Sequence, residues 1–197
     1  LLIFLSHSVE KKADVMQRII FGSAEIASIA EFYIRHDTAY DVVAFTVDDE
    51  LVEGDVFEGK PIIPFGEVRK RYPPQSHHMH VALSSAQLNQ LRQRKYAQVK
   101  SAEYHLASYI SSRATIWPDL IVGDNCLILE NQTIQPFVRI GANVMIWSGN
   151  HIGHGAVIGD HTYISSHVVI SGHCEIGQRS FLGVNSTVRD FCQIGDD

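Results

Sequence analysis

Two histidines three residues apart, His151 and His154, lie among glycines and small apolar residues in the stretch NHIGHGAVIGD, residues 150–160. Histidine titrates near neutral pH, so His154 could act as a general base. The pair could also bind a metal ion, or serve only as turn residues in a repetitive scaffold. The local spacing does not separate these interpretations, but the period of the surrounding chain restricts them.

A strict six-residue period runs through the second half of the chain. Every sixth residue from Ile116 to Ile194 is a large aliphatic, at fourteen successive positions. An α-helix cannot keep such a stripe on one face, and an ordinary strand would alternate with period two. Two residues before each aliphatic lies a second, mostly small residue, and Cys126, Cys174 and Cys192 all fall in this column. The pattern predicts a parallel β-helix of hexapeptide repeats over 113–197, with the cysteines as buried structural thiols.

Three hexads form one triangular coil of 18 residues, so residues 18 apart stack. We expect glycines and asparagines after the aliphatics to occupy turns with positive φ. His154 would stack between Pro136 and Gly172, neither of which is a metal ligand. We therefore expect no metal within one protomer, although a zinc site shared between protomers stays open. Turn or surface positions are the favoured interpretation of the other repeat histidines, His161, His167 and His173.

The first half alternates strand-like and helix-like segments. Strands are predicted over 18–21, 41–49 and 79–85, with helices after 22, near 65 and over 86–102. The last helix would bury Leu88, Leu91 and Tyr96. Alternating strands and helices predict a parallel sheet in a small Rossmann-like domain over 16–112. The fold class is therefore α/β followed by all-β.

The turn after the first strand, Gly22-Ser23-Ala24, resembles the start of a G-x-G-x-x-G motif in which alanines replace two of the glycines. Backbone N–H groups at the helix N-terminus could hold a phosphate. Tight packing of strand against helix is the alternative. Asp48, at the end of the second strand, is placed to meet a ribose or base edge. Its alternative role is a solvated turn carboxylate.

Composition excludes several classes of protein. A formal net charge of −6 argues against a general nucleic-acid-binding surface. Three cysteines without CxxC spacing predict neither a disulfide framework nor a zinc ribbon, and a reducing, cytoplasmic setting fits them best. We expect no membrane segment. We expect residues 1–15 to be an upstream or cloning-derived segment, and the ending IGDD to be a truncation, because a solenoid needs a terminal cap.

Four stretches, IIFGSAEIA, EGKPII, NHIGHGAVIGDHTYIS and VVISGHCEIG, are similar to those of a known family. Over 16–197 the chain resembles the sugar acyltransferases of the sialic acid O-acetyltransferase family, which include bacillosamine and perosamine N-acetyltransferases. The resemblance implies a left-handed β-helix, a homotrimer, acetyl-CoA bound between adjacent β-helices, and a nucleotide-activated sugar held by the amino-terminal domain. It places the general base at His154 and the glycine near the acetyl group at Gly172. Family members often carry a carboxylate or another polar residue directly after the histidine, where this chain has Gly155.

The expected function is acetylation of an amino or hydroxyl group of a nucleotide-activated sugar for surface polysaccharide synthesis, with the amine preferred. Tyr163 and Trp147 lie near the proposed site in sequence and could pack on the ligand or fill a protomer interface. A zinc lyase of the carbonic anhydrase type, and a non-catalytic trimeric sugar-nucleotide-binding scaffold, are the alternatives. Substrate binding is expected at Gly22, Ser23, Ala24, Asp48 and His151, and cofactor binding at Gly172 and Tyr163.

Overall fold

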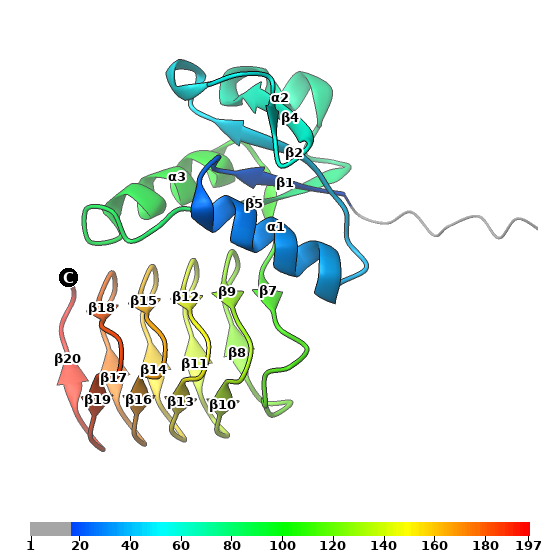
Figure 1. Cartoon of the computed structure of the whole chain (residues 1–197). Helices are drawn as coiled ribbons and strands as arrows, with labels where there is room; N and C mark the ends of the chain where they lie inside the picture. Colours follow the sequence, from blue (N-terminus) through cyan, green and yellow to red (C-terminus); the bar gives the residue numbers. More distant parts are fainter. Residues whose placement is uncertain (1–16) are drawn as a thin grey trace, which may run out of the picture.

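The computed structural model describes residues 17–197, and the predicted upstream segment lies outside these residues. An α/β region sits on one side of a long triangular prism of short strands (Figure 1). No helix in residues 17–197 has both the length and the apolar content that a membrane crossing needs.

The α/β region is a six-stranded sheet in the order β3-β4-β2-β1-β5-β6. All neighbouring strands are parallel except β3 and β4. The strand order reverses at β1, between β2 and β5, which confirms the predicted Rossmann-like arrangement. The bounds are β1 Gln17–Phe21, α1 Glu25–Asp37, β2 Val42–Val47, η1 Asp49–Leu51, β3 Val56–Phe57, β4 Lys60–Pro64, α2 Phe65–Arg71, β5 His77–Val81, α3 Gln90–Ser101 and β6 His105–Leu106.

The helix predicted from residue 86 begins later, at Gln90. The three residues before it all have left-handed backbone angles, so the helix cannot start there. Asn89 holds this turn in place, since its buried amide donates to the carbonyl oxygens of the last coils of the prism. Leu88, predicted to be buried, is consequently 54% exposed. Leu91 and Tyr96 are half-buried.

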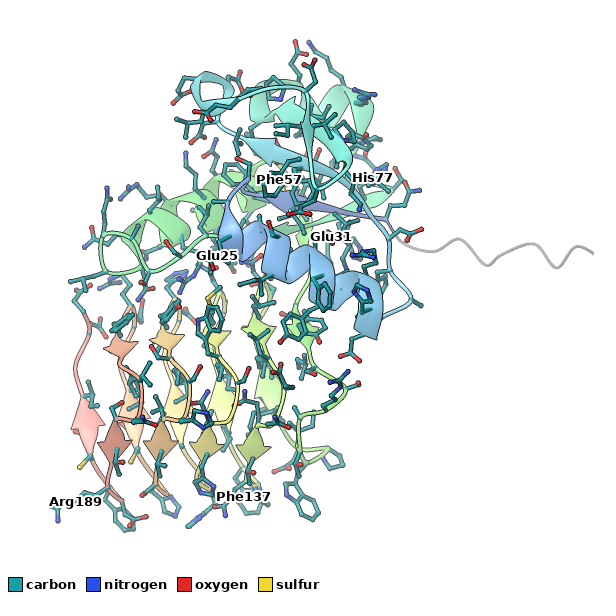
Figure 2. The ribbon with its side chains drawn as sticks, in the orientation of Figure 1. Glu25, Glu31, Phe57, His77, Phe137 and Arg189 are labelled. Carbon is teal, nitrogen blue, oxygen red and sulfur yellow. The ribbon has the colours of Figure 1, made fainter. Side chains whose placement is uncertain are left out.

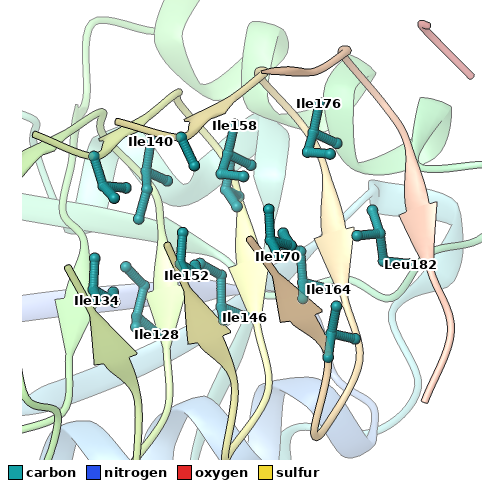
Figure 3. Packing of buried hydrophobic residues seen from close by; sticks show 14 of the residues in the cluster. Ile128, Ile134, Ile140, Ile146, Ile152, Ile158, Ile164, Ile170, Ile176 and Leu182 are labelled. Carbon is teal, nitrogen blue, oxygen red and sulfur yellow. The ribbon is translucent and has the colours of Figure 1, made fainter. Parts of the chain in front are cut away.

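The prism is a left-handed parallel β-helix, in agreement with the hexad pattern, which predicts the parallel β-helix, and with the resemblance, which implies its hand. Residues 18 apart pair directly, for example Ile140 with Ile158. The aliphatic column from Ile128 to Leu182 stacks inside the prism and is buried (Figure 3). The two-residue strands are β7 Tyr109–Ile110, β8 Ile121–Val122, β9 Leu127–Ile128, β10 Thr133–Ile134, β11 Arg139–Ile140, β12 Met145–Ile146, β13 His151–Ile152, β14 Val157–Ile158, β15 Tyr163–Ile164, β16 Val169–Ile170, β17 Glu175–Ile176, β18 Phe181–Leu182, β19 Thr187–Val188 and β20 Gln193–Ile194.

Three parallel sheets form the walls of the prism. Sheet 1 is β18-β15-β12-β9-β7, sheet 2 is β10-β13-β16-β19, and sheet 3 is β20-β17-β14-β11-β8. The chain passes from sheet 1 to sheet 2 to sheet 3 in each coil. The turns between them form three vertices, which we name by the sheets that they join.

The turn residues divide their roles differently from the prediction. From Val122 onward, positive φ falls on the third residue after each aliphatic, such as Asn125 and Asn143. The glycines directly after the aliphatics do not have positive φ; they permit close contact between coils. A Cβ added to Gly123 would lie 2.5 Å from the backbone nitrogen of Ala142. Coil stacking therefore requires a glycine at Gly123, Gly141, Gly153, Gly159 and Gly177, whereas a Cβ at Gly183 or Gly195 would meet no atom within 4 Å.

The three cysteines occupy the small inward column, as predicted. Cys126 and Cys174 are fully buried and donate weak hydrogen bonds from Sγ to backbone carbonyl oxygens. Cys192 is only half-buried, which corrects the prediction for this residue. Cys192 belongs to the last coil, where Ile194 is also 38% exposed.

The α/β region packs on sheet 1 and on the adjoining 3–1 vertex. Leu127 and Met145, which point outward from sheet 1, share a buried cluster with Ala27 of α1. Arg92 of α3 is 1% exposed and donates a 2.7 Å hydrogen bond to the carbonyl oxygen of His161 at the 3–1 vertex. The 2–3 vertex therefore lies on the side of the prism away from the α/β region.

Candidate active site at the 2–3 vertex

His154 lies in the turn that follows β13, at the 2–3 vertex. Its side chain is exposed to solvent. Figure 2 shows Phe137, from the turn one coil earlier at the same vertex, on the side of the prism opposite α1 and Glu25. The predicted base is thus held on a rigid β-helix turn and is open to an incoming molecule.

The closest polar partner of His154 is Gln135, which precedes it by 19 residues on the neighbouring coil. Gln135 Oε1 lies 2.9 Å from the backbone nitrogen of His154 and 3.1 Å from its ring Nδ1. Sequence reasoning missed this residue. The 18-residue coil could have found it, because the spacing places Gln135 beside Gly153, next to the histidine.

Gly172 stacks directly on His154, as the coil spacing predicts. A Cβ at Gly172 would lie 2.7 Å from Cε1 and 2.9 Å from Nε2 of the imidazole. Because Gly172 has no side chain, the imidazole of His154 can occupy this space. The Gly172 N–H donates a 2.9 Å hydrogen bond to Asp190 Oδ1, so this group already has an acceptor.

The residue after the histidine, Gly155, has φ of +67°. A Cβ at Gly155 would meet Nδ1 of His173 at 2.7 Å. A carboxylate at this position would be strained in the backbone and would collide with the neighbouring ring. The departure from the family pattern at Gly155 thus has a local physical reason.

Aromatic rings line the rest of the 2–3 vertex. The rings of His154 and His173 meet edge to face with centroids 4.9 Å apart. His173 in turn stacks on Phe191 at 5.2 Å. Phe137 and Phe191 are 73% and 75% exposed. The vertex therefore offers an apolar surface beside a titratable group.

The remaining repeat histidines are dispersed around the prism. His151 points outward from sheet 2 and pairs with Thr133 and Val169 of the neighbouring coils. His161 is buried under α3, where its Nδ1 lies 2.9 Å from the side-chain nitrogen of Asn143. Within residues 17–197 no three histidine, cysteine, aspartate or glutamate side chains gather in a group that could hold a metal ion.

The residues predicted to bind substrate in the α/β region lie on the side of the prism opposite the 2–3 vertex that carries His154. Gly22 has φ of +136°, and a Cβ there would approach the carbonyl oxygen of Ala82 to 2.7 Å. This glycine is required by the packing of the turn against the end of β5. Ser23 and Ala24 precede α1, and Ala24 is its N-cap, without a side-chain capping bond. The helix begins at the point where the strand order reverses.

Asp48 forms an ion pair with Lys95 of α3, at 2.6 Å between Oδ2 and Nζ. Both side chains are mostly buried, at 16% and 19% exposure. The structure therefore gives Asp48 a partner that the sequence did not reveal. Lys95 Nζ also lies 5.8 Å from the ring centroid of Phe21, across the carboxyl end of β1.

Tyr163 and Trp147 lie on sheet 1, beneath the α/β region. The indole Nε1 of Trp147 donates to the Tyr163 hydroxyl, and Tyr163 stacks on Phe181 at 5.2 Å. These aromatic side chains are therefore not brought to His154 within one protomer.

The chain thus combines a Rossmann-like region, a hexapeptide-repeat β-helix and an exposed histidine at one vertex of that β-helix. The family model described as "Bacterial transferase hexapeptide (six repeats)" matches residues 137–172, which contain His154. No curated protein matches the chain in sequence.

Solved structures with the same fold are found at low sequence identity. The chain is 21% identical to PerB from Caulobacter crescentus, solved in complex with CoA and GDP-perosamine, with a TM-score of 0.81 over 92% of this chain and 84% of that one. It is 18% identical to the acetyltransferase domain of PglB from Neisseria gonorrhoeae FA1090, with a TM-score of 0.78 over 92% and 86%. WeeI from Acinetobacter baumannii AYE is 15% identical, with a TM-score of 0.58 over 92% and 94%. The shared fold therefore includes both the α/β region and the β-helix.

Proposed function

We propose that the protein is an acetyl-CoA-dependent acyltransferase that acetylates an amino group of a nucleotide-activated sugar, with a sugar hydroxyl as the second acceptor. The observation that carries this proposal is the exposed imidazole of His154, held against Gln135 and fitted over Gly172 at the 2–3 vertex. The complexes of PerB with CoA and GDP-perosamine, and of the PglB domain with acetyl coenzyme A, support it.

The chemistry needs one base and no covalent enzyme intermediate, because a thioester is already activated. His154 accepts a proton from the acceptor amine as the amine nitrogen attacks the thioester carbonyl carbon. A C–N bond forms and the carbonyl oxygen becomes an oxyanion. The C–S bond then breaks, and the leaving thiolate takes the proton from the imidazolium. The products are an N-acetyl sugar and free CoA.

The nucleotide moiety is assigned to the turn Gly22–Ala24 and to Asp48. This turn lies at the carboxyl end of β1, where the strand order reverses, and doubly wound sheets bind ligands at such points. The helix N-terminus after Ala24 has no side-chain cap and offers N–H groups to a phosphate. Asp48 would accept a hydrogen bond from a ribose hydroxyl while Lys95 holds its carboxylate.

A homotrimer would reconcile the positions of the two halves of the site. The α/β region covers sheet 1 and the 3–1 vertex, whereas His154 lies at the 2–3 vertex, so a sugar held at Gly22 needs the histidine of another protomer. The exposed Phe137, Val157 and Val169 on that side would be covered in such an assembly. His151, outward on sheet 2, would lie beside the acceptor. Sedimentation of the purified protein tests this assembly, and a monomer with full activity would contradict it.

We place the protein in the cytoplasm, where acetyl-CoA and nucleotide sugars are made. Its three cysteines are all free thiols, in agreement with a reducing compartment.

The direct test is release of CoA from acetyl-CoA with a panel of UDP-, dTDP- and GDP-linked amino sugars. His154→Ala should lower kcat by about 10²- to 10⁴-fold with an active acceptor. His167→Ala, at an exposed turn of the 1–2 vertex, is the matched control and should keep wild-type activity. Full activity of His154→Ala would overturn the role of the histidine. Sugar-nucleotide binding without turnover would indicate a scaffold, and stoichiometric zinc would indicate a lyase.

A further inference from the structure

A neutral amide, the side chain of Gln135, contacts two nitrogen atoms of His154. Gln135 Oε1 lies 2.9 Å from the backbone nitrogen and 3.1 Å from Nδ1 of the same histidine. The Gln135 backbone is fixed, because its own N–H donates to the Ile152 carbonyl oxygen at 2.9 Å. The amide is thus presented to the histidine from a rigid coil.

This shared contact determines which ring nitrogen carries the proton. A backbone N–H can only donate, so the Gln135 atom that it meets must be the amide oxygen and not the amide nitrogen. An amide oxygen can only accept, so Nδ1 of His154 must be protonated to approach it. The other ring nitrogen, Nε2, then keeps its lone pair.

We propose that Gln135 is a positioning residue that holds His154 in the Nδ1–H tautomer and leaves Nε2 free as the base. The catalytic consequence rests on the proposed acyltransferase function, whereas the tautomer itself does not. Gln135 takes the place that a carboxylate partner would otherwise fill, since Gly155 excludes one directly after the histidine.

A neutral partner has a different electrostatic effect from a carboxylate. An amide oxygen orients the ring without adding the negative charge that favours imidazolium. The other titratable or charged groups at this vertex are His173, edge to face with His154, Asp190, which accepts from the Gly172 N–H, the exposed Arg189 next to it, and Asp119, which accepts from the Phe137 N–H.

Nitrogen-15 NMR of the histidine side chains tests the tautomer without any substrate. Wild-type protein should show His154 protonated at Nδ1 at high pH. Gln135→Leu should shift the population toward the Nε2–H form. Gln135→Glu keeps an oxygen acceptor, so it should keep the Nδ1–H form. Gln178→Leu, the same change at an exposed turn of another vertex, should alter neither property.

Kinetics then measure the consequence for catalysis. Gln135→Leu should lower kcat about tenfold or more with KM for acetyl-CoA little changed, because a base in the wrong tautomer cannot take the proton. Gln135→Glu should recover most of the activity, because it keeps an oxygen acceptor for Nδ1–H. An unchanged His154 tautomer in Gln135→Leu would overturn the proposal. If Gln135→Leu shows the expected tautomer change but His154→Ala keeps full activity, the positioning by Gln135 stands and the catalytic role of His154 is overturned.

Discussion

His154 and Gly172 are matched across two stacked coils, since the imidazole occupies the space that a side chain at Gly172 would need. An added Cβ would lie 2.7 Å from Cε1 and 2.9 Å from Nε2 of the ring. The position of the proposed base therefore depends on a residue that has no functional group of its own.

We predict that Gly172→Ala displaces the imidazole and lowers kcat by roughly 10- to 100-fold, since small errors in placing a catalytic group are costly. Initial rates of CoA release measure the effect. Gly183→Ala is the control, because a Cβ there meets no atom within 4 Å. Equal rates for the two alanine variants would show that the fit over Gly172 is unimportant.

Arg92 joins the α/β region to the β-helix, and its loss should destabilise the protein. The guanidinium is almost fully buried and donates to carbonyl oxygens of Ser84, His161 and Thr162. Arg92→Met removes this donor from the carbonyl oxygens of Ser84 and His161, while that of Thr162 keeps the Met145 N–H, and should cost about 3 kcal/mol in the free energy of unfolding. Urea denaturation measures it. Arg94→Met, on the exposed side of α3, should change stability by less than about 0.5 kcal/mol.

His80 should make the protein less stable in acid. It is fully buried in β5, and desolvation lowers its pKa to about 4. Above its ordinary pKa of about 6.5 the group is neutral in both states. As the pH falls from there to about 4, the unfolded chain binds a proton that the folded chain rejects, so stability is lost by about 3 kcal/mol.

The variant His80→Asn keeps an N–H near the Ala107 carbonyl oxygen, which now lies 2.9 Å from Nδ1, but cannot titrate. Its free energy of unfolding should vary less with pH between about 6.5 and 4 than that of the wild type. His36→Asn, at an exposed position, is the control. The same acid sensitivity in His80→Asn as in the wild type would exclude His80 as its source.

The cost of truncating the aliphatic column should depend on its position along the prism. Ile146 is fully buried between two neighbouring coils, whereas Ile194 is 38% exposed in the final ring. Ile146→Ala should cost about 2–5 kcal/mol in the free energy of unfolding because it leaves a cavity. Ile194→Ala should cost clearly less. Similar losses in both variants would contradict the uneven burial.

Much of the fold could be predicted from the sequence because its signals are local or periodic. The aliphatic at every sixth residue indicates a coil of fixed length, and that length alone places His154 over Gly172. The Gly22 turn and the alternation of strands and helices predict the α/β sheet. The start of α3 could not be predicted, since Leu88 looks like a core residue until Asn89 is seen to bind the distant coil.

The candidate site, like the fold, can be predicted from the sequence only in part. The sequence identifies His154, but the partner of its Nδ1 comes from another coil, whereas the family pattern points to the adjacent residue, Gly155. Asp48 is predictable from its place after a strand, and only the fold shows Lys95 against it. The sequence by itself determined the repeat and the two-part architecture, because these follow from spacing and alternation along the chain, and its resemblance to a family singled out His154 as the proposed base. Only the tertiary structure decided which vertex the α/β region covers and which side chains meet, because single long-range contacts such as that of Arg92 leave no periodic trace.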